Sequence, residues 1–210
     1  MTWENLTEDA EALRKVLGLD KWAVLGHSFG GMIALEYALR YPKSITHLVL
    51  MDSGAESTLL QRNAPAVLAQ RGFSTEKVET ARRLFNGELE ARQVALAMVR
   101  LGRAYYHNFG PLMQVRAAVN ALKIRSKPEA CVFGFQNLLR DWSIKEKLPG
   151  ISVPVLLIAG REDFQFPPEY QVDMAKAFPN ARCVIIEKAS HNPLMEQPQK
   201  TMALIRAFIP

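Results

Sequence analysis

The sequence predicts an α/β protein whose open, mainly parallel sheet of about four strands is interrupted by a helical insertion. Short apolar runs alternate with helical patterns at both ends of the chain, which is typical of parallel βα units. The middle of the chain, residues 55–148, holds helical patterns and no convincing strand. With 210 residues, 49% of them hydrophobic, the chain is long enough for one sizeable core.

The N-terminal part predicts a helix, a strand, a second helix and a second strand. The first helix is "LTEDAEALRKVLG", with Thr7 as its N-cap, Gly18 at its end and an apolar stripe. The stripe consists of Leu13, Val16 and Leu17. The next elements are a buried strand over 21–26, a helix over 29–41 that ends before Pro42, and a buried strand over 45–53.

The same pattern returns after Pro149-Gly150. It predicts a strand over 154–160, a helix over 167–178, a strand over 181–188 and a final helix over 197–209. Between the two α/β parts, helices are predicted at 76–85, 88–106 and 111–123. We therefore expect 1–54 and 149–210 to form the core and 55–148 to form a helical cap inserted in it.

Charge and composition exclude several classes of protein. The segment 55–148 carries 15 Lys/Arg against 8 Asp/Glu, but these charges are scattered on helical patterns without the dense clustering of a nucleic-acid site. The N-terminus does not resemble a signal peptide, and no apolar run approaches the length of a membrane span. We expect a cytoplasmic protein without nucleic-acid or membrane partners. Cys131 and Cys183 follow no pattern, so they are expected to be reduced thiols, with a single disulfide as the alternative.

The stretch "GHSFGG" (26–31) indicates a nucleophile. Gly26 and Gly30 flank Ser28 at positions −2 and +2, between a predicted strand and a predicted helix. Such a turn holds the serine hydroxyl at the top of the sheet, and the next backbone N–H, that of Phe29, points where an oxyanion would form. The bland alternative is a glycine-rich turn with an incidental serine. The glycine spacing fits neither nucleotide-binding motif.

A nucleophilic serine needs a base and an orienting acid, and the last two strands supply both. Asp163 follows the strand ending at Gly160, and His191 follows the last strand. The carboxyl ends of parallel strands share one edge of the sheet, so these residues are expected beside Ser28. Glu162 and Asp52 are the alternative acids.

The remaining histidines, His27, His47 and His107, show no metal-ligand spacing, so no metal or other cofactor is predicted. His27 precedes the nucleophile directly, and its side chain is expected to point away from Ser28.

These motifs together resemble the serine α/β-hydrolases, in particular the group of proline iminopeptidases and related esterases and lactonases. The similar stretches are "TWENLTEDAEALRKVLGLDKWAVLGHSFGGMIALEYALRYP", "VPVLLIAGREDFQFPPE" and "ASHNPLMEQP". The resemblance implies a truncated α/β-hydrolase fold, because members begin with further strands and a His-Gly loop that supplies a second oxyanion N–H. Residues 1–25 hold no counterpart of these parts. A slow esterase that is poor on amides is therefore expected.

The expected function is hydrolysis of a small-molecule carboxylic ester, with amides as a second option, through an acyl-enzyme on Ser28. The alternative is a catalytically impaired remnant that binds a partner. The outer edge of the strand 21–26 is expected to be exposed and covered in a homo-oligomer. The aromatic side chains of the cap suggest an apolar pocket, although most of them are expected simply to hold the cap helices together. They are Phe85, Tyr105, Tyr106, Phe109, Phe133, Phe135 and Trp142. Glu88, Glu90 and Glu129 are the candidate anchors for a substrate amino terminus.

Overall fold

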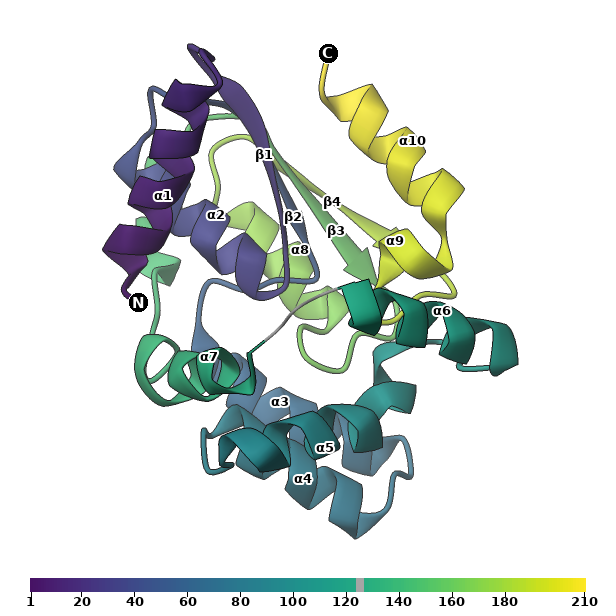
Figure 1. The fold of residues 1–210 in the computed structure, drawn as a ribbon. Helices are drawn as coiled ribbons and strands as arrows, with labels where there is room; N and C mark the ends of the chain where they lie inside the picture. The colour runs from purple at the N-terminus through teal and green to yellow at the C-terminus, as the bar shows by residue number, and fades with distance from the viewer. Residues whose placement is uncertain (124–126) are drawn as a thin grey trace.

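The computed structural model describes residues 1–123 and 127–210. Its sheet has four parallel strands in the order β1-β2-β3-β4 (Figure 1). The strands are β1 (Trp22–His27), β2 (Ile45–Met51), β3 (Val155–Gly160) and β4 (Ala181–Ile186). The prediction of an open parallel sheet of about four strands is confirmed.

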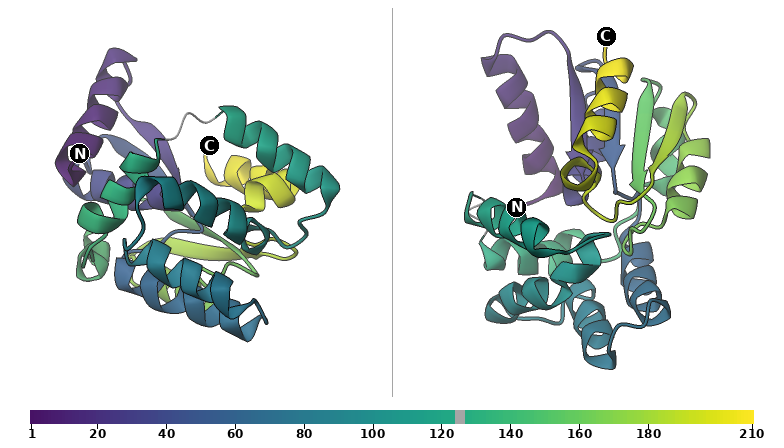
Figure 2. Two further views of the ribbon diagram at one scale, coloured as in Figure 1. Left: turned by 60° about the horizontal axis from the view of Figure 1, so that its bottom comes forward. Right: turned by 90° about the vertical axis from the view of Figure 1, so that its right-hand side faces the viewer.

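Both faces of the sheet are covered by helices, which explains the apolar runs of the strands. Along β2, Leu48 and Leu50 pack into one hydrophobic cluster and Val49 and Met51 into another. The first cluster includes residues of α2 (Phe29–Arg40) and α8 (Pro168–Lys176), and the second lies under α10 (Pro198–Phe208). Figure 2 shows the two helical layers on either side of the strands. The strands follow one another across the sheet in sequence order. Right-handed crossover connections therefore place α2, between β1 and β2, and α8, between β3 and β4, on the same face.

The first helix, α1 (Trp3–Val16), begins earlier than the sequence predicts. Its N-cap is Thr2, whose side chain accepts the Asn5 N–H, and Thr7 lies inside the helix with its hydroxyl bonded back to Trp3 and Glu4 carbonyls. Thr2, five residues upstream, takes the capping role that the sequence assigned to Thr7. Gly18 follows the helix end with φ +68°, as expected of a terminating glycine.

The face of α1 that packs on the protein carries polar residues beside the apolar Trp3 and Ala10, which contact the hydrophobic core. Glu11 and Thr7 are its buried residues, and Tyr37 of α2 donates a 2.8 Å hydrogen bond to Glu11. Arg14 forms a two-pronged ion pair with the same carboxylate. The predicted stripe at positions 13, 16 and 17 is exposed, because this charged network turns the opposite face inward.

Helices dominate the segment between β2 and β3 and lie at the carboxyl ends of the strands (Figures 1 and 2). They are α3 (Ser57–Gln70), α4 (Thr75–Phe85), α5 (Ala91–Leu101), α6 (Pro111–Lys123) and α7 (Pro128–Phe133), with short helical turns at Gly102–Tyr105, Gly134–Leu138 and Lys145–Gly150. The predicted helix over 88–106 is divided between α5 and the turn that follows it. In the described part of this segment, the one strand-like pairing is a bridge between Glu56 and Ser143 at its base. The cap as a separate unit stays a prediction.

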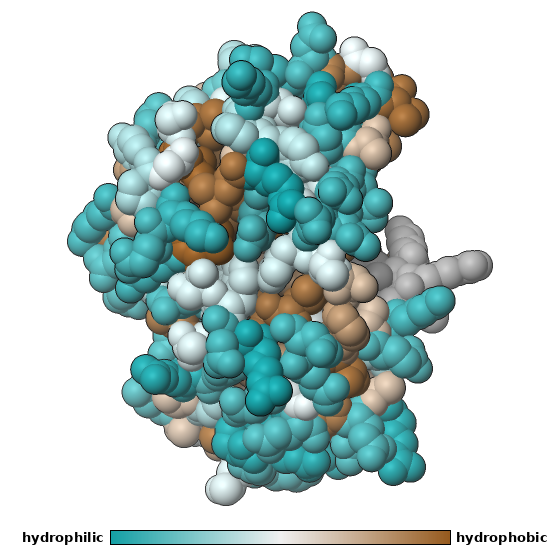
Figure 3. All heavy atoms as spheres, turned by 90° about the vertical axis from the view of Figure 1, so that its left-hand side faces the viewer, coloured by the Kyte–Doolittle hydropathy of each residue, from teal (hydrophilic) through white to brown (hydrophobic). Residues whose placement is uncertain are grey.

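Strand β1 forms one end of the sheet, and Leu25 on it is 43% exposed. The same part of the chain exposes the apolar residues Leu13, Val16, Leu17 and Leu19. The space-filling view of the α1 side shows apolar patches within a largely hydrophilic surface (Figure 3). None of the described helices is long and apolar enough to span a bilayer. Cys131 and Cys183 are both free.

Candidate active site

Ser28 occupies a strained turn between β1 and α2. Its φ of 52° and ψ of −124° are unfavourable for a residue with a side chain. Two hydrogen bonds to the neighbouring strand and its loop hold this conformation: Ser28 N–H donates to the Met51 carbonyl (2.9 Å), and Ser53 Oγ donates to the Ser28 carbonyl (2.8 Å). The turn therefore fixes the position of the serine hydroxyl at the carboxyl end of β1.

The glycines around Ser28 differ in how much room a side chain would have at their positions. A Cβ at Gly26 would lie 2.4 Å from the Gly30 carbonyl oxygen, and one at Gly31 would lie 2.4 Å from Ser53 Oγ. Gly30, the other glycine that flanks Ser28, has nothing within 4 Å of its hypothetical Cβ. The close contacts are made by its carbonyl oxygen and by Gly31 instead.

Ser28, His191 and Asp163 form a hydrogen-bonded chain, as their order along the sheet predicts. His191 Nε2 lies 2.9 Å from Ser28 Oγ, and His191 Nδ1 lies 3.0 and 3.1 Å from the two Asp163 oxygens. The Gln165 N–H also donates to Asp163, at 2.8 Å. Asp163 is 1% and His191 3% exposed, so bulk water does not screen this chain.

The acceptor at Nδ1 fixes the tautomer of His191. Because Asp163 accepts from Nδ1–H, Nε2 of the neutral ring is free to accept the Ser28 proton. Phe29 is the first residue of α2 and follows Ser28 directly. The first N–H groups of a helix have no intrahelical acceptor, so the Phe29 N–H is available to an oxyanion.

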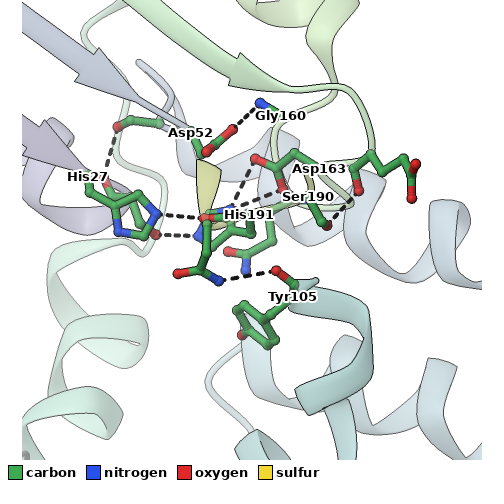
Figure 4. Close-up of polar contacts among 12 residues, drawn as sticks. His27, Asp52, Tyr105, Gly160, Asp163, Ser190 and His191 are labelled. Carbon is green, nitrogen blue, oxygen red and sulfur yellow. Dashed lines mark hydrogen bonds and ion pairs between the residues drawn. The ribbon is translucent and has the colours of Figure 1, made fainter. Parts of the chain in front are cut away.

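His27 lies beside the chain rather than away from it, contrary to our expectation. Its Nε2 donates to the His191 carbonyl at 2.7 Å, and the two rings are 5.0 Å apart (Figure 4). Burial, with a smaller effect from His191, lowers the pKa of His27 to about 4. A neutral His27 therefore ties β1 to the backbone of His191, a role that depends on a contact across 164 residues and left no signal in the sequence.

The two alternative acids do not contact the His191 ring. Glu162 pairs with His107 Nδ1. Asp52 follows β2 and accepts the Gly160 N–H at 2.7 Å. His47 packs edge-on against Phe208 on the far side of the sheet.

The residues around His191 are bonded to one short stretch of the helical segment. Asn192 Nδ2 donates to the Tyr105 carbonyl at 3.1 Å, and the Ser190 hydroxyl lies 2.9 Å from the Ala104 carbonyl oxygen. Glu196 accepts the N–H groups of both His107 (2.5 Å) and Ser190 (2.8 Å). Burial raises the pKa of the Glu196 carboxyl. These contacts connect the segment between α5 and α6 to the loop that carries His191.

Ser28, Phe29 and His191 open into a cavity of about 690 Å³. Its lining is mainly apolar, and most of it comes from the helical segment. The lining residues from that segment are Phe85, Met98, Tyr105, Lys127, Ala130, Cys131, Gly134, Phe135 and Leu139. Three of the seven aromatic residues predicted for an apolar pocket are among them.

The other four predicted aromatic residues are used elsewhere. Tyr106 and Phe109 stack on each other, Trp142 stacks on Trp3, and Phe133 is 38% exposed. Phe166, which we did not single out, stacks on the His191 ring at 6.2 Å.

No carboxylate lines the described wall of this cavity. Glu88 pairs with Arg82 and Glu90 with Arg92 on the surface, and Glu129 is exposed. Within 1–123 and 127–210, no group of three or more His, Cys, Asp or Glu residues could hold a metal ion.

The alpha/beta hydrolase fold family model matches residues 1–198. The chain belongs to this family. The α/β-hydrolase relatives include a proline iminopeptidase from Pestalotiopsis fici, 26% identical over 99% of this chain and 74% of its own. A pimeloyl-[acyl-carrier protein] methyl ester esterase from Aeromonas hydrophila is 26% identical over 89% of this chain and 69% of its own.

Solved structures agree with this fold. The proline iminopeptidase of Mycobacterium smegmatis superimposes with a TM-score of 0.74 at 24% identity, covering 99% of this chain and 71% of that one. The named relatives are hydrolases, which supports a hydrolase here as well.

Proposed function

We propose that this α/β-hydrolase cleaves carboxylic esters through an acyl-enzyme on Ser28. The observation that supports this most is the chain from Ser28 Oγ through His191 to Asp163, with its serine end in a mainly apolar cavity. A buried serine–histidine–carboxylate chain with these distances is the arrangement that activates a hydroxyl for acyl transfer.

In the proposed reaction, His191 Nε2 takes the Ser28 proton as Oγ attacks the ester carbonyl. Asp163 stabilises the imidazolium that forms, and the Phe29 N–H stabilises the oxyanion. His191 then protonates the leaving alcohol as the C–O bond breaks. Water, activated by the same imidazole, attacks the acyl-enzyme and releases the acid.

The cavity favours neutral esters with an apolar acyl group over peptides with a free amino terminus. Its described lining offers apolar contacts near Ser28 and no carboxylate to bind an ammonium group. An unpaired ammonium in such a cavity would lose its hydration without compensation. The names of the relatives cover both amide and ester substrates, and this lining is the reason for proposing esters.

The test is hydrolysis of p-nitrophenyl esters of increasing acyl length, alongside a proline anilide. We expect turnover of the esters, with kcat/KM rising with acyl length, and little turnover of the anilide. Ser28→Ala should lower kcat by at least about a thousandfold. Ser74→Ala, at an exposed serine before α4, is the matched control and should leave kcat unchanged. Ester turnover that survives Ser28→Ala would reject the proposal.

A further inference from the structure

Asp52 is a buried carboxyl group that the proposed reaction does not use. It is fully buried, and its backbone has the unusual φ of +43° for a residue with a side chain. Its Oδ1 accepts the Gly160 N–H at 2.7 Å. Its Oδ2 is buried without a hydrogen-bond donor among the described residues. A buried polar atom without a hydrogen-bond partner destabilises the folded state, so a group near Asp52 is expected to pair with Oδ2.

The neighbour of Asp52 is the Asp163 carboxyl group. Figure 4 shows the two carboxyl groups close together beyond the ends of β2 and β3, and the charge of Asp163 is one of the causes that raise the pKa of Asp52. Two ionised carboxylates have only acceptor atoms, so they cannot hydrogen bond to each other. One proton between them turns this repulsive contact into a short, favourable hydrogen bond.

The surroundings assign that proton to Asp52 rather than to Asp163. Asp163 accepts N–H bonds from Gln165 and His191, which stabilise its ionised form. Asp52 has one N–H donor, and the other titratable groups facing it are Glu196 and the Cys183 thiol. Burial, and then the charge of Asp163, raise the pKa of Asp52 well above its ordinary value.

We propose that Asp52 carries a proton on Oδ2 and donates it to the Asp163 carboxylate, so that a neutral carboxyl group positions the acid that orients His191. This inference rests on the proposed function of the Ser28–His191–Asp163 chain. Asp52 is then a positioning residue: it contacts neither substrate nor His191. It connects Asp163 to the Gly160 N–H, and so to the end of β3.

Two substitutions test whether the hydrogen bonds of a neutral Asp52, rather than its charge, support Asp163. Asp52→Asn preserves an oxygen for the Gly160 N–H and offers an amide N–H in place of the Oδ2–H. Asp52→Ala removes both. We expect kcat/KM of Asp52→Asn for a p-nitrophenyl ester to stay within about threefold of the wild type, whereas Asp52→Ala lowers kcat by about 10- to 100-fold with little change in KM.

The pH dependence of kcat/KM tests independently whether Asp52 is charged or neutral. An ionised Asp52 would stabilise the imidazolium of His191 by its charge, so Asp52→Asn would then move the acidic limb of the kcat/KM profile to lower pH. A neutral Asp52 predicts that Asp52→Asn leaves this limb in place. A shifted limb, or an Asp52→Asn variant as impaired as Asp52→Ala, would overturn the proposal.

Infrared spectroscopy of the purified protein tests the proton without relying on activity. The wild type at neutral pH should show a protonated-carboxyl carbonyl band that is missing from Asp52→Asn. A band that is present in the wild type and absent from Asp52→Asn would support the proposal even if the protein hydrolysed no ester. In that case the proposed function would fail separately. Identical spectra of wild type and Asp52→Asn would overturn the proposal.

Discussion

The carbonyl oxygen of Ser190 lies so close to Gly160 that a Cβ added at Gly160 would be 1.8 Å away from it. This contact joins the end of β3, which leads to Asp163, with the loop that carries His191. Backbone cannot move aside as a flexible side chain can, so the two loops can approach this closely only with glycine at position 160. Much of the geometry of the site depends on this one approach.

Gly160→Ala is therefore expected to separate the two loops. We expect a loss of at least about 1–3 kcal/mol in the free energy of unfolding, from overpacking, together with a fall in kcat. Gly30→Ala is the matched control, because its Cβ would meet no atom within 4 Å. Thermal unfolding and ester hydrolysis check both variants. A Gly160→Ala protein as stable as Gly30→Ala would show that the loops can shift freely.

Glu196 is expected to connect the helical segment to catalysis. Glu196→Ala leaves the N–H groups of Ser190 and His107 without their acceptor, so the His191 loop should become mobile and kcat should fall by about tenfold or more. Glu187→Ala, which removes an exposed ion pair with Arg161, is the control. A kcat of Glu196→Ala equal to that of the control would mean that His191 needs no such support.

The Glu11 network gives a pH-dependent prediction for stability. The hydrogen-bonded Arg14 guanidinium lowers the pKa of Glu11 to about 2. The pKa is lower in the folded state, so its stabilising contribution is present above the ordinary value of 4.5 and is lost as the pH falls toward 2. Glu11→Gln should cost about 2 kcal/mol at pH 7 and progressively less in acid.

Denaturant unfolding of the wild type and Glu11→Gln at several pH values measures this difference. Glu8→Gln, an exposed position of the same helix, is the control. A difference that stays constant down to pH 2 would contradict the assignment of the shift to Glu11.

Much of this site could be predicted from local sequence. A serine between a buried strand and a helix, followed by acidic and histidine residues after later strands, fixes which residues meet, because parallel strands share one carboxyl edge. The contacts that support the chain could not be predicted in this way. His27 binds the backbone of His191, and Glu196 binds that of His107, across long separations that leave no periodic signal. In α1, the apolar stripe predicted the wrong buried face, because the Glu11–Tyr37 bond outweighed it.

We propose that a second copy of the chain covers the exposed edge of β1. Leu25 on this strand is 43% exposed, and unpaired edges with apolar side chains favour association. Light scattering at micromolar concentration should give a dimer or larger oligomer, and Leu25→Lys should lower the mass. Thr46→Lys, at an exposed position of β2, is the control. A monomeric wild type would contradict the proposal.

The proposed function requires that the folded protein activates Ser28. Its most direct test is the rate of labelling by a fluorophosphonate, with the modified residue located by mass spectrometry. We expect rapid modification of Ser28 alone, slowed by about a hundredfold or more in His191→Gln, which removes the base. Failure of Ser28 to react in the folded wild type would contradict its activation and favour a protein that binds a partner without catalysis.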